Sequence, residues 1–324
     1  MDEITYGQAI RDALAEEMRR DERVFVMGED VGPYGGSFKV TKGLFEEFGG
    51  ERVRDTPISE AGFTGVGVGA ALTGLHPVVE IMFCDFTTIA MDQLVNQAAK
   101  LRYMTGGQVK VPLTIRTTMG GGKSGAAQHS QSLHAWFAHM PGLKVATPST
   151  PYDVKGMLKA AIRDDNPVII FEHKLLYNTK GPVPEEEYIV PLGKADIKRT
   201  GEDVTVVASS LMVHKSLAAA AALEREGISV EVVDVRSLYP LDVETVAASV
   251  RKTMRAVVAD EGVMRYGASA ELAAVIYENA LDYLDAPVVR VAGRETPMPF
   301  SPPLEAEVIP DEGDIIRAIR SLLQ

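Results

Sequence analysis

The sequence predicts an α/β protein made of two doubly wound domains. Its 324 residues are enough for two domains of about 150 residues each. Short runs of unbroken apolar residues alternate with amphipathic helical patterns, which is typical of parallel sheets covered by helices on both faces. A stretch rich in proline and glutamate interrupts the alternation at 181–200. We expect it to link a first domain at 1–180 to a second domain at 201–324.

The first half is expected to begin with a helix. Thr5 followed by Gln8 fits a capping box, and apolar residues from Ile10 to Met18 follow with helical spacing. Thr150 and Pro151 mark the start of a later helix, as its cap and its first residue. Further helices are expected at 61–75, from 91 to the glycine pair 106–107, and at 130–139, and strands at 24–27, near 53, and at 77–83, 111–117, 144–147 and 168–171.

The helix expected at 61–75 is unusually rich in glycine. It contains Gly62, Gly65, Gly67 and Gly69, and each glycine costs about 1 kcal/mol relative to alanine in an exposed helix. We therefore expect another backbone to approach this helix closely, as it would at a subunit interface.

The second half repeats the α/β pattern. Strands are expected at 204–208, 230–235, 256–259 and 288–291, and helices at 214–226, 269–279 and 313–323.

Composition excludes several classes of protein. A composition of 46% hydrophobic and 24% charged residues is that of a folded protein and excludes global disorder. The net charge is −12 without a basic stripe, so we expect no nucleic-acid or anionic-membrane partner. The single cysteine, Cys84, excludes an intrachain disulfide and fits a reducing compartment. With neither a signal peptide at Met1 nor an apolar stretch of about 20 residues, we expect a cytoplasmic protein.

Familiar site motifs fail on spacing. The run from Gly120 to Ser124 ends like a P-loop, but Thr117 stands where its first glycine should be. The glycines at 65–69 lack the dinucleotide-binding spacing and lie inside the expected helix. His129, His134 and His139 fall five residues apart, which does not place two of them on one helix face. We expect His134 and His139 to be ordinary core or surface histidines.

Six collinear motifs resemble one family. They cover MGEDV at 27–31, DTPISEAGF at 55–63, DQLVNQAAK at 92–100, AAQHSQS at 126–132, PGLKV at 141–145 and AIRDDNP at 161–167. Together they resemble the β subunit of the thiamine-diphosphate-dependent decarboxylating component of 2-oxo acid dehydrogenase complexes, in the pyruvate and acetoin dehydrogenase branch. The resemblance implies an N-terminal thiamine-pyrimidine-binding domain and a C-terminal domain like that of transketolase.

The resemblance also implies roles for particular residues. Glu60 matches the acid that is hydrogen-bonded to the aminopyrimidine ring and drives its tautomerisation. Ile58 lies before it, residues 61–63 (AGF) follow it, and no basic residue stands within five positions, a partly apolar setting that suits such proton transfer. Phe86 matches the aromatic residue that stacks on the pyrimidine, and Ile89 is expected one turn later, facing the same pocket. His129 matches the histidine that handles protons while the acyl group moves to lipoamide, a role that suits its near-neutral pKa.

Metal sites and partners follow from the same resemblance. The family's structural potassium ion maps to oxygen atoms of Leu113, Ala161, Ile162, Asp164 and Asn166. The Gly-Asp-Gly motif that usually holds the Mg²⁺ of the diphosphate is missing, since Gly313-Asp314 is followed by isoleucine. We therefore expect an α subunit to hold Mg²⁺ in an α2β2 heterotetramer, and a lipoyl acyltransferase core to dock mainly on the C-terminal domain.

The expected function is that of a pyruvate dehydrogenase β subunit, active only with its α subunit. Acetoin dehydrogenase and branched-chain 2-oxo acid dehydrogenase are the alternatives, and the segment EHKLLY at 172–177 is more like the acetoin enzymes. A nicotinamide-dependent oxidoreductase, a non-catalytic scaffolding subunit and a self-sufficient transketolase-like enzyme are further, less favoured readings.

Overall fold

The computed structural model describes residues 2–324 and divides into two compact units. Unit 1 contains the chain up to Met119 together with Trp136–Leu192, and unit 2 contains Gly120–Ala135 and Gly193–Gln324. The segment 120–135 therefore groups with unit 2, although it lies before the expected linker.

Unit 1 is built on a parallel sheet. Six of its strands follow the order β6-β7-β5-β4-β2-β3, and each pair of neighbours is parallel. Their bounds are β2 Val24–Gly28, β3 Val53–Asp55, β4 His76–Phe83, β5 Thr114–Met119, β6 Lys144–Ala146 and β7 Val168–His173. Every residue of β2, β5 and β7 is buried, as expected for central strands of a parallel sheet that is covered on both faces.

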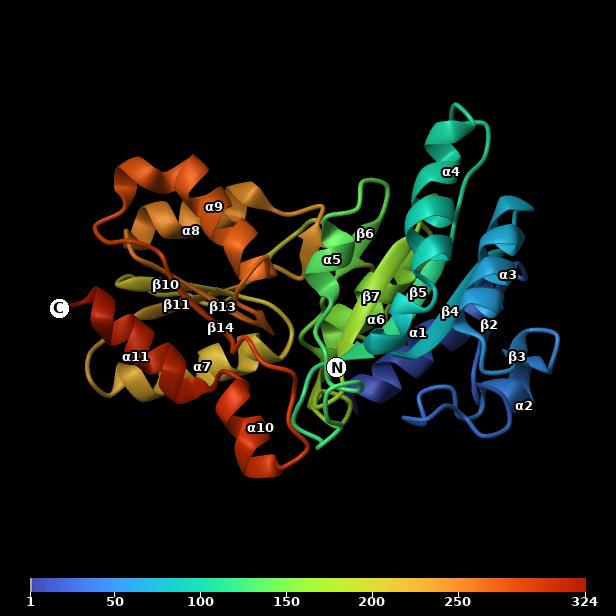
Figure 1. Ribbon diagram of the computed structural model, residues 1–324, viewed down its shortest axis with the longest axis horizontal. Coiled ribbons are helices and arrows are strands. Elements are labelled where there is room, and N and C mark those ends of the chain that lie inside the picture. The colour runs from blue at the N-terminus through green and yellow to red at the C-terminus, as the bar shows by residue number, and fades with distance from the viewer. Residues whose placement is uncertain (1) are drawn as a thin grey trace. The chain divides into compact units, whose positions relative to one another are not determined.

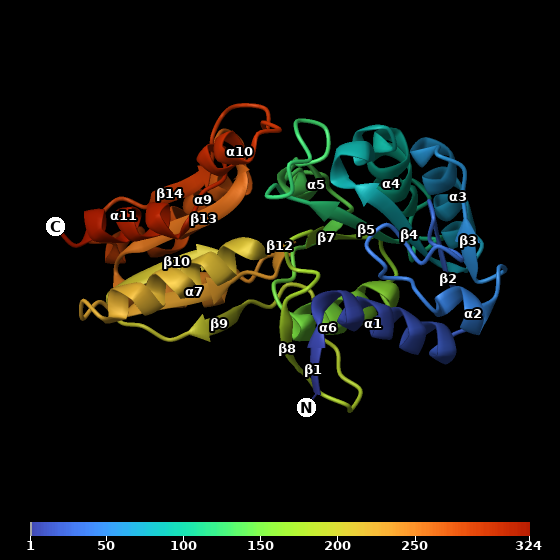
Figure 2. The same ribbon diagram turned by 90° about the horizontal axis from the view of Figure 1, so that it is seen from below.

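Helices cover both faces of this sheet. Figure 2 shows α1 (Tyr6–Arg20) and α6 (Pro151–Ile162) on one face, and α3 (Glu60–Leu72) and α4 (Ala99–Met104) on the other. Thr5 accepts from the Gln8 N–H at the start of α1, and Thr150 caps α6 before Pro151, so both predicted helix starts are confirmed. The remaining elements are β1 Asp2–Thr5, antiparallel to β8 Lys180–Val183, and the short helices α2 Leu44–Phe48 and α5 His134–Ala138.

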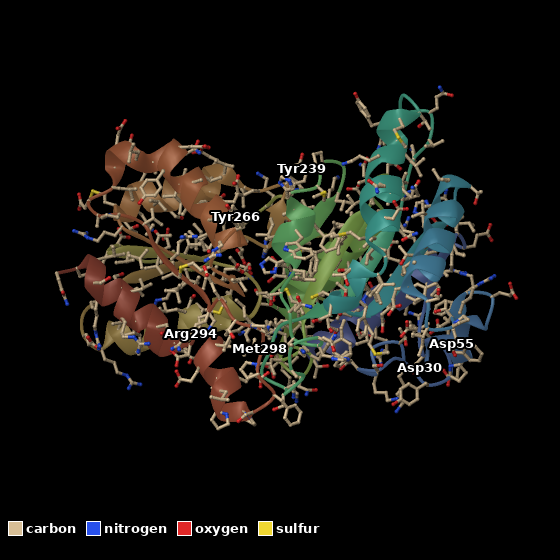
Figure 3. All side chains as sticks on the ribbon, in the orientation of Figure 1. Asp30, Asp55, Tyr239, Tyr266, Arg294 and Met298 are labelled. Atoms are coloured by element: carbon tan, nitrogen blue, oxygen red, sulfur yellow. The ribbon has the colours of Figure 1, made fainter. Side chains whose placement is uncertain are left out.

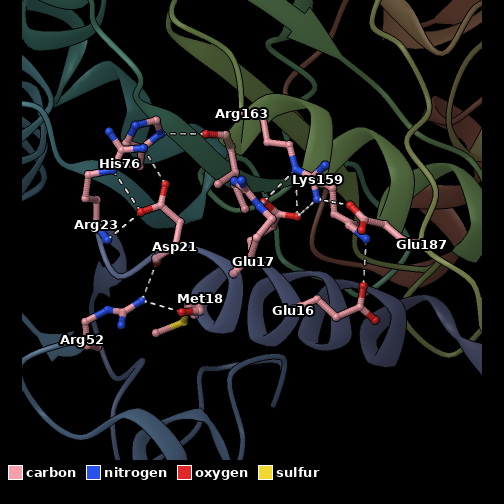
Figure 4. Close-up of polar contacts among 12 residues, drawn as sticks. Glu16, Glu17, Met18, Asp21, Arg23, Arg52, His76, Lys159, Arg163 and Glu187 are labelled. Carbon is pink, nitrogen blue, oxygen red and sulfur yellow. Dashed lines mark hydrogen bonds and ion pairs between the residues drawn. The ribbon is translucent and has the colours of Figure 1, made fainter.

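Ion pairs with one buried partner each join α1 to α6 (Figure 4). Glu17, which is fully buried, accepts from the Arg163 guanidinium at 2.5–3.1 Å. The Nη2 atom of Arg163 also donates to Glu187 Oε1, at 2.6 Å. Lys159 and Glu16 form a further pair, at 2.9 Å. These contacts fix the register of the two helices beneath the sheet.

Unit 2 is a second doubly wound sheet. Its order is β14-β13-β10-β11-β9, parallel except for the antiparallel edge strand β9. Figure 1 shows α7 and α11 on one face and α8 and α9 on the other. The strands are β9 Asp196–Arg199, β10 Val204–Ala208, β11 Val230–Asp234, β12 Ser237–Tyr239, β13 Ala256–Val263 and β14 Val289–Gly293; the helices are α7 Leu211–Glu224, α8 Val243–Thr253, α9 Ala268–Ala280, η3 Leu281–Tyr283, α10 Pro302–Val308 and α11 Glu312–Leu322.

Several predicted bounds are wrong for local reasons. The expected linker 181–200 contains most of β8 and all of β9. Strand β5 starts at Thr114 rather than 111, because Pro112 has no N–H to give to a sheet. Helix α5 begins at His134 rather than 130, since the Gln131 carbonyl accepts the Gly120 N–H and closes a loop.

The helix expected from residue 91 is only partly α-helical. It contains a π-helix, η2 (Asp92–Ala98), before α4, and it stops, as predicted, at Gly106 and Gly107, which adopt positive φ. Helices α8 and α10 have no counterpart in the sequence analysis. Within residues 2–324, no helix has the length and apolar character needed to cross a membrane.

Candidate functional site

Three neighbouring strands of unit 1 end at one edge of the sheet with polar or aromatic residues after them. Strand β2 lies between β3 and β4. Glu29 follows β2 directly, Glu60 follows β3 at the start of α3, and Phe86 follows β4. In doubly wound sheets, ligands bind outside the carboxyl ends of the strands. This edge is therefore the candidate site of unit 1.

Glu60 is the first residue of α3 and is 4% exposed. The preceding residue, Ser59, makes no side-chain cap to the helix. Glu60 thus places a buried carboxyl group at the positive end of the helix dipole, where negative charge is stabilised.

Glu29 is a second carboxyl group at this edge, which was not predicted from the sequence. One of its oxygens is buried and has no hydrogen-bond partner among the described residues. Burial raises the pKa of Glu29, and the nearby charges of Glu60 and Asp30 raise it further. Two carboxyl groups therefore share this edge, and one of them has an acceptor free for a donor. The sequence feature that could have indicated Glu29 is its position directly after a buried strand, inside the motif at 27–31.

The loop after β2 is tied to the end of β3. The Gly32 N–H donates to Asp55 Oδ1 at 2.6 Å, and a Cβ on Gly32 would lie 2.7 Å from Asp55 Oδ2. Figure 3 labels Asp30 and Asp55 at this end of unit 1. The contact holds the backbone next to Glu29 in place.

Phe86 lies in the short helix η1 (Cys84–Thr88) and is half-buried. Its ring meets Phe83 edge-on at 5.8 Å, Phe83 meets Phe38 in the same way, and Phe38 stacks on Tyr177 at 5.0 Å. The N–H of Ile89 donates to the Phe86 carbonyl at 3.0 Å, and the Ile89 side chain is 55% exposed. A row of aromatic rings therefore fixes Phe86, while Ile89 faces solvent in this chain.

A buried charge network adjoins the row. Arg116, 1% exposed, binds Glu80 at 2.6 Å and Glu172 at 2.7 and 2.9 Å, and the Tyr177 hydroxyl donates to Glu172 at 2.6 Å. Burial alone would lower the pKa of Arg116, but the two carboxylates outweigh it and raise the pKa. Burial raises the pKa of Tyr177, and the charge of Glu172 raises it further. The guanidinium is thus permanently charged, and it anchors the end of β7 and the base of the aromatic row.

His129 belongs to unit 2, in the segment 120–135, and its side chain is exposed. The segment closes on itself where the Gly120 N–H donates to the Gln131 carbonyl at 3.0 Å. His134 is buried and bonded to Asp260 at 2.9 Å, whereas His139 is exposed. Those two histidines are the ordinary core and surface residues that were expected.

The five positions expected to bind potassium lie around the turn after α6. The Leu113 carbonyl accepts the Val168 N–H at 2.9 Å, and the Ala161 carbonyl accepts the Asp164 N–H at 3.1 Å. His76 lies 3.0 Å from the Ile162 carbonyl, and Asn166 donates to Asp164. A carbonyl oxygen has two lone pairs and can accept from more than one partner. Among the described residues, no group of three His, Cys, Asp or Glu side chains is placed to hold a metal ion.

Comparisons with known proteins identify the family. The chain matches the model of the transketolase pyrimidine binding domain over residues 2–180 and that of the transketolase C-terminal domain over 193–315. It is 48% identical over 320 residues to the pyruvate dehydrogenase E1 component subunit beta of Rhizobium meliloti (strain 1021), covering 98% of this chain and 70% of that protein. The chain belongs to the E1 β-subunit family.

Other members of the E1 β-subunit family are equally similar. The beta subunit of acetoin:2,6-dichlorophenolindophenol oxidoreductase of Bacillus subtilis (strain 168) is 48% identical, with 99% of this chain and 97% of that protein covered. The 2-oxoisovalerate dehydrogenase subunit beta of the same organism is 47% identical, with both chains covered completely. A solved structure, a split gene transketolase described as an inactive beta4 tetramer, superposes with a TM-score of 0.80 at 26% identity and covers 99% of this chain and 98% of its own. These matches confirm the expected family and the transketolase-like fold.

Proposed function

We propose that this chain is the β subunit of a pyruvate-type 2-oxo acid dehydrogenase component and supplies the aminopyrimidine half of a thiamine diphosphate site. The observation that carries the proposal is the pair of carboxyl groups at the end of β2 and β3. Glu60 is buried at the N-terminus of α3, and Glu29 beside it has a buried oxygen without a donor. A ring bearing both a protonatable nitrogen and an amino group is the kind of partner that such a pair accepts.

The residues of this edge fit the cofactor. Glu60 would hold the ring nitrogen and keep a proton on it, and Phe86, fixed by its row of rings, would stack on the pyrimidine. When bound, thiamine diphosphate supplies the nucleophilic carbon and the electron sink for decarboxylation. Ile89 would contribute apolar surface beside Phe86, and His129 would handle the proton during acyl transfer to lipoamide.

The remaining parts of the site are assigned to partners. We assign Mg²⁺ to an α subunit in an α2β2 heterotetramer, and the acyl acceptor to a lipoyl acyltransferase core. A structural potassium ion fits the oxygen atoms at Leu113, Ala161, Ile162, Asp164 and Asn166, because carbonyl, amide and carboxylate oxygens suit hard cations. The cytoplasm is the proposed location.

The choice of pyruvate over acetoin rests on what residues 172–177 do. Their likeness to acetoin enzymes favoured acetoin, but Glu172 and Tyr177 are buried in the Arg116 network. Their identity therefore reflects packing at the end of β7 and carries little information on substrate. Since the pyruvate relatives are 45–50% identical to this chain, and the acetoin and branched-chain relatives 48% and 47%, acetoin remains the second candidate.

The substrate is tested in the complex reconstituted with its α subunit. Reduction of an artificial electron acceptor is measured with pyruvate, branched-chain 2-oxo acids and acetoin, with and without thiamine diphosphate. We expect thiamine-dependent turnover on pyruvate to exceed that on the other two. Turnover on acetoin with none on pyruvate would reverse the assignment.

The role of Glu60 is tested by Glu60→Gln. The amide keeps the shape of the side chain but cannot exchange a proton with the ring, so we expect kcat to fall by about 10²–10⁴-fold. Glu51→Gln is the matched control, because the Glu51 side chain is 93% exposed and pairs only weakly, with Arg54. Full activity of Glu60→Gln would show that the chain is a scaffold rather than a catalytic subunit.

A further inference from the structure

The segment 120–135 is held at both ends by acidic side chains of unit 2. At its start, the Gly121 N–H donates to Glu261 at 2.7 Å. At its end, the His134 ring bonds to Asp260 at 2.9 Å. Asp260 and Glu261 are consecutive residues of β13, so one strand end holds two points that are thirteen residues apart in the chain.

Glu305 makes the most specific contact. One of its carboxylate oxygens accepts the Gly122 N–H at 2.8 Å, and the other accepts the Ser124 N–H at 3.0 Å. The residue lies on α10 and is 4% exposed, although its neighbours Leu304 and Ala306 are exposed. A buried carboxylate is costly unless it is hydrogen-bonded. The Glu305 side chain therefore binds the loop backbone and is not a solvated residue on the surface of α10.

The contact explains the P-loop-like sequence at 120–124. Successive backbone N–H groups of such a glycine-rich loop can converge on an anion. Here the anion is the carboxylate of Glu305, from the same chain, where a P-loop would hold phosphate.

The loop backbone adopts conformations of high energy, which the hydrogen bonds to Glu305 help to hold. Gly120 and Gly122 have φ of 92° and 86°, and the non-glycine residues Ser124 and Ala126 have φ of 54° and 57°. Non-glycine residues in the left-handed region persist only where the surroundings hold them. A Cβ on Gly121 would lie 2.5 Å from Ile309 and 3.1 Å from Met298, which Figure 3 labels. The start of the loop thus packs tightly on the chain around α10.

His129 lies within the held segment, three residues after Ala126. The backbone at Gly125 is closely packed against this part of the segment. A Cβ on Gly125 would lie 2.9 Å from the His129 carbonyl oxygen and 2.8 Å from the hydroxyl oxygen of the buried Ser130. The backbone that carries the histidine therefore has little freedom once Gly122 and Ser124 are bound to Glu305.

We propose that Glu305 is a positioning residue for His129: its carboxylate fixes the loop that presents the imidazole for acyl transfer. This inference rests on the role proposed for His129. It makes α10, a helix of the C-terminal domain, part of the catalytic apparatus without contact to substrate.

The test is Glu305→Gln in the reconstituted complex. In the glutamine side chain, an NH₂ group replaces one of the two oxygens that accept the Gly122 and Ser124 N–H groups, so one hydrogen bond is lost. The other oxygen still accepts, but it no longer carries a negative charge. We expect amide hydrogen exchange of the peptide 119–131 to speed up by about tenfold or more, because hydrogen bonds to charged groups are the stronger ones. Reductive acylation of a lipoyl domain should fall by about tenfold, while KM for the 2-oxo acid and turnover with an artificial acceptor stay near the wild-type values.

Glu307→Gln is the matched control. It lies two residues away on α10, its side chain is 69% exposed, and it pairs with Arg294 on the surface. It should leave both loop exchange and acylation unchanged. If Glu305→Gln fails to assemble, Glu261→Gln, which loses one loop contact, is measured in the same assays with the same expectation.

His129→Ala separates this proposal from the proposed function. Its acylation defect should not increase when Glu305→Gln is added, since both changes act through the same imidazole. Normal acylation by His129→Ala would overturn the role of His129 itself. A defective His129→Ala beside a normal Glu305→Gln, or additive defects in the double variant, would overturn only the positioning role.

Discussion

At the scale of single residues, buried charges hold the functional segments of this chain in place. His134 is an example. Burial by itself lowers the pKa of the imidazole, but the charge of Asp260, its hydrogen bond and the charge of Glu261 together raise the pKa above the ordinary value. The histidine therefore stays charged in the fold over a wider pH range than in the unfolded chain.

The sign of the pH dependence follows from this shift. A pKa raised in the folded state gives stability that is complete below the unfolded value, about 6.5, and is lost as pH rises through the folded value. We expect His134→Gln to cost about 3 kcal/mol at pH 6, the cost of breaking a buried pair, and less at pH 9.

The measurement is urea unfolding of both proteins between pH 6 and pH 9. His139→Gln is the control, because His139 is exposed, and it should match the wild type throughout. A cost for His134→Gln that stays constant or grows with pH would mean that the pair is not charged in the fold.

Part of this residue-scale picture could be predicted from the sequence. Glu60 could be predicted because it lies in a family motif with apolar residues around it. In the structure its side chain is buried. Glu29 was not predicted, since its pKa is raised first by burial in the fold and then by the charge of Glu60, 31 positions away. Glu305 was not predicted either, because an acid on a short surface helix is normally solvated, and only tertiary packing buries it.

At the scale of elements, α3 shows what its glycines are for. Its glycines predict another backbone close by. The helix was predicted to reach residue 75 but ends at Leu72. At Gly67 the close neighbour is a side chain: a Cβ would lie 2.7 Å from Val79 on β4 and 3.4 Å from Leu113. At Gly69 nothing lies within 4 Å. Only one of these two glycines is needed for packing within the chain.

This contrast predicts opposite effects of one substitution on the same helix. Gly67→Ala should destabilise the chain by about 1–3 kcal/mol, because the methyl group overpacks the helix–sheet contact. Gly69→Ala should stabilise it by up to about 1 kcal/mol, because alanine is the better helix former. Urea unfolding of the purified chain measures both. Equal effects would show that helix propensity rather than packing decides the cost.

Elements with an unbroken apolar core were the easiest to predict. Strands β2, β7, β10 and β11 fall within two residues of their expected bounds. Helix α8 was missed, although Asp242 caps it, because proline and leucine before the cap obscured its start. The π-helical stretch η2 has the same apolar spacing as an α-helix over one or two turns, so periodicity does not separate the two.

At the scale of the whole molecule, the proposed function gives this chain half of a cofactor site. In that proposal, unit 1 supplies carboxyl groups and aromatic surface for the pyrimidine, and the net charge of the chain is −12. A diphosphate needs concentrated positive charge, and the described residues hold no cluster of three side chains suited to a metal ion. Under the proposed function, Mg²⁺ and ligands from the α subunit would hold the charged tail of the cofactor.

The decisive prediction concerns the purified chain without its partner. Calorimetric titration with thiamine diphosphate and Mg²⁺ should give no saturable binding at micromolar cofactor, because stacking on Phe86 and one contact to Glu60 do not offset the cost of ordering the ligand. Adding the α subunit should restore binding at one cofactor per αβ pair, and Glu60→Gln should weaken it in the complex. Saturable, magnesium-dependent binding by the chain alone would mean that the diphosphate half of the site is in this polypeptide, and the division of labour proposed for the two subunits would be wrong.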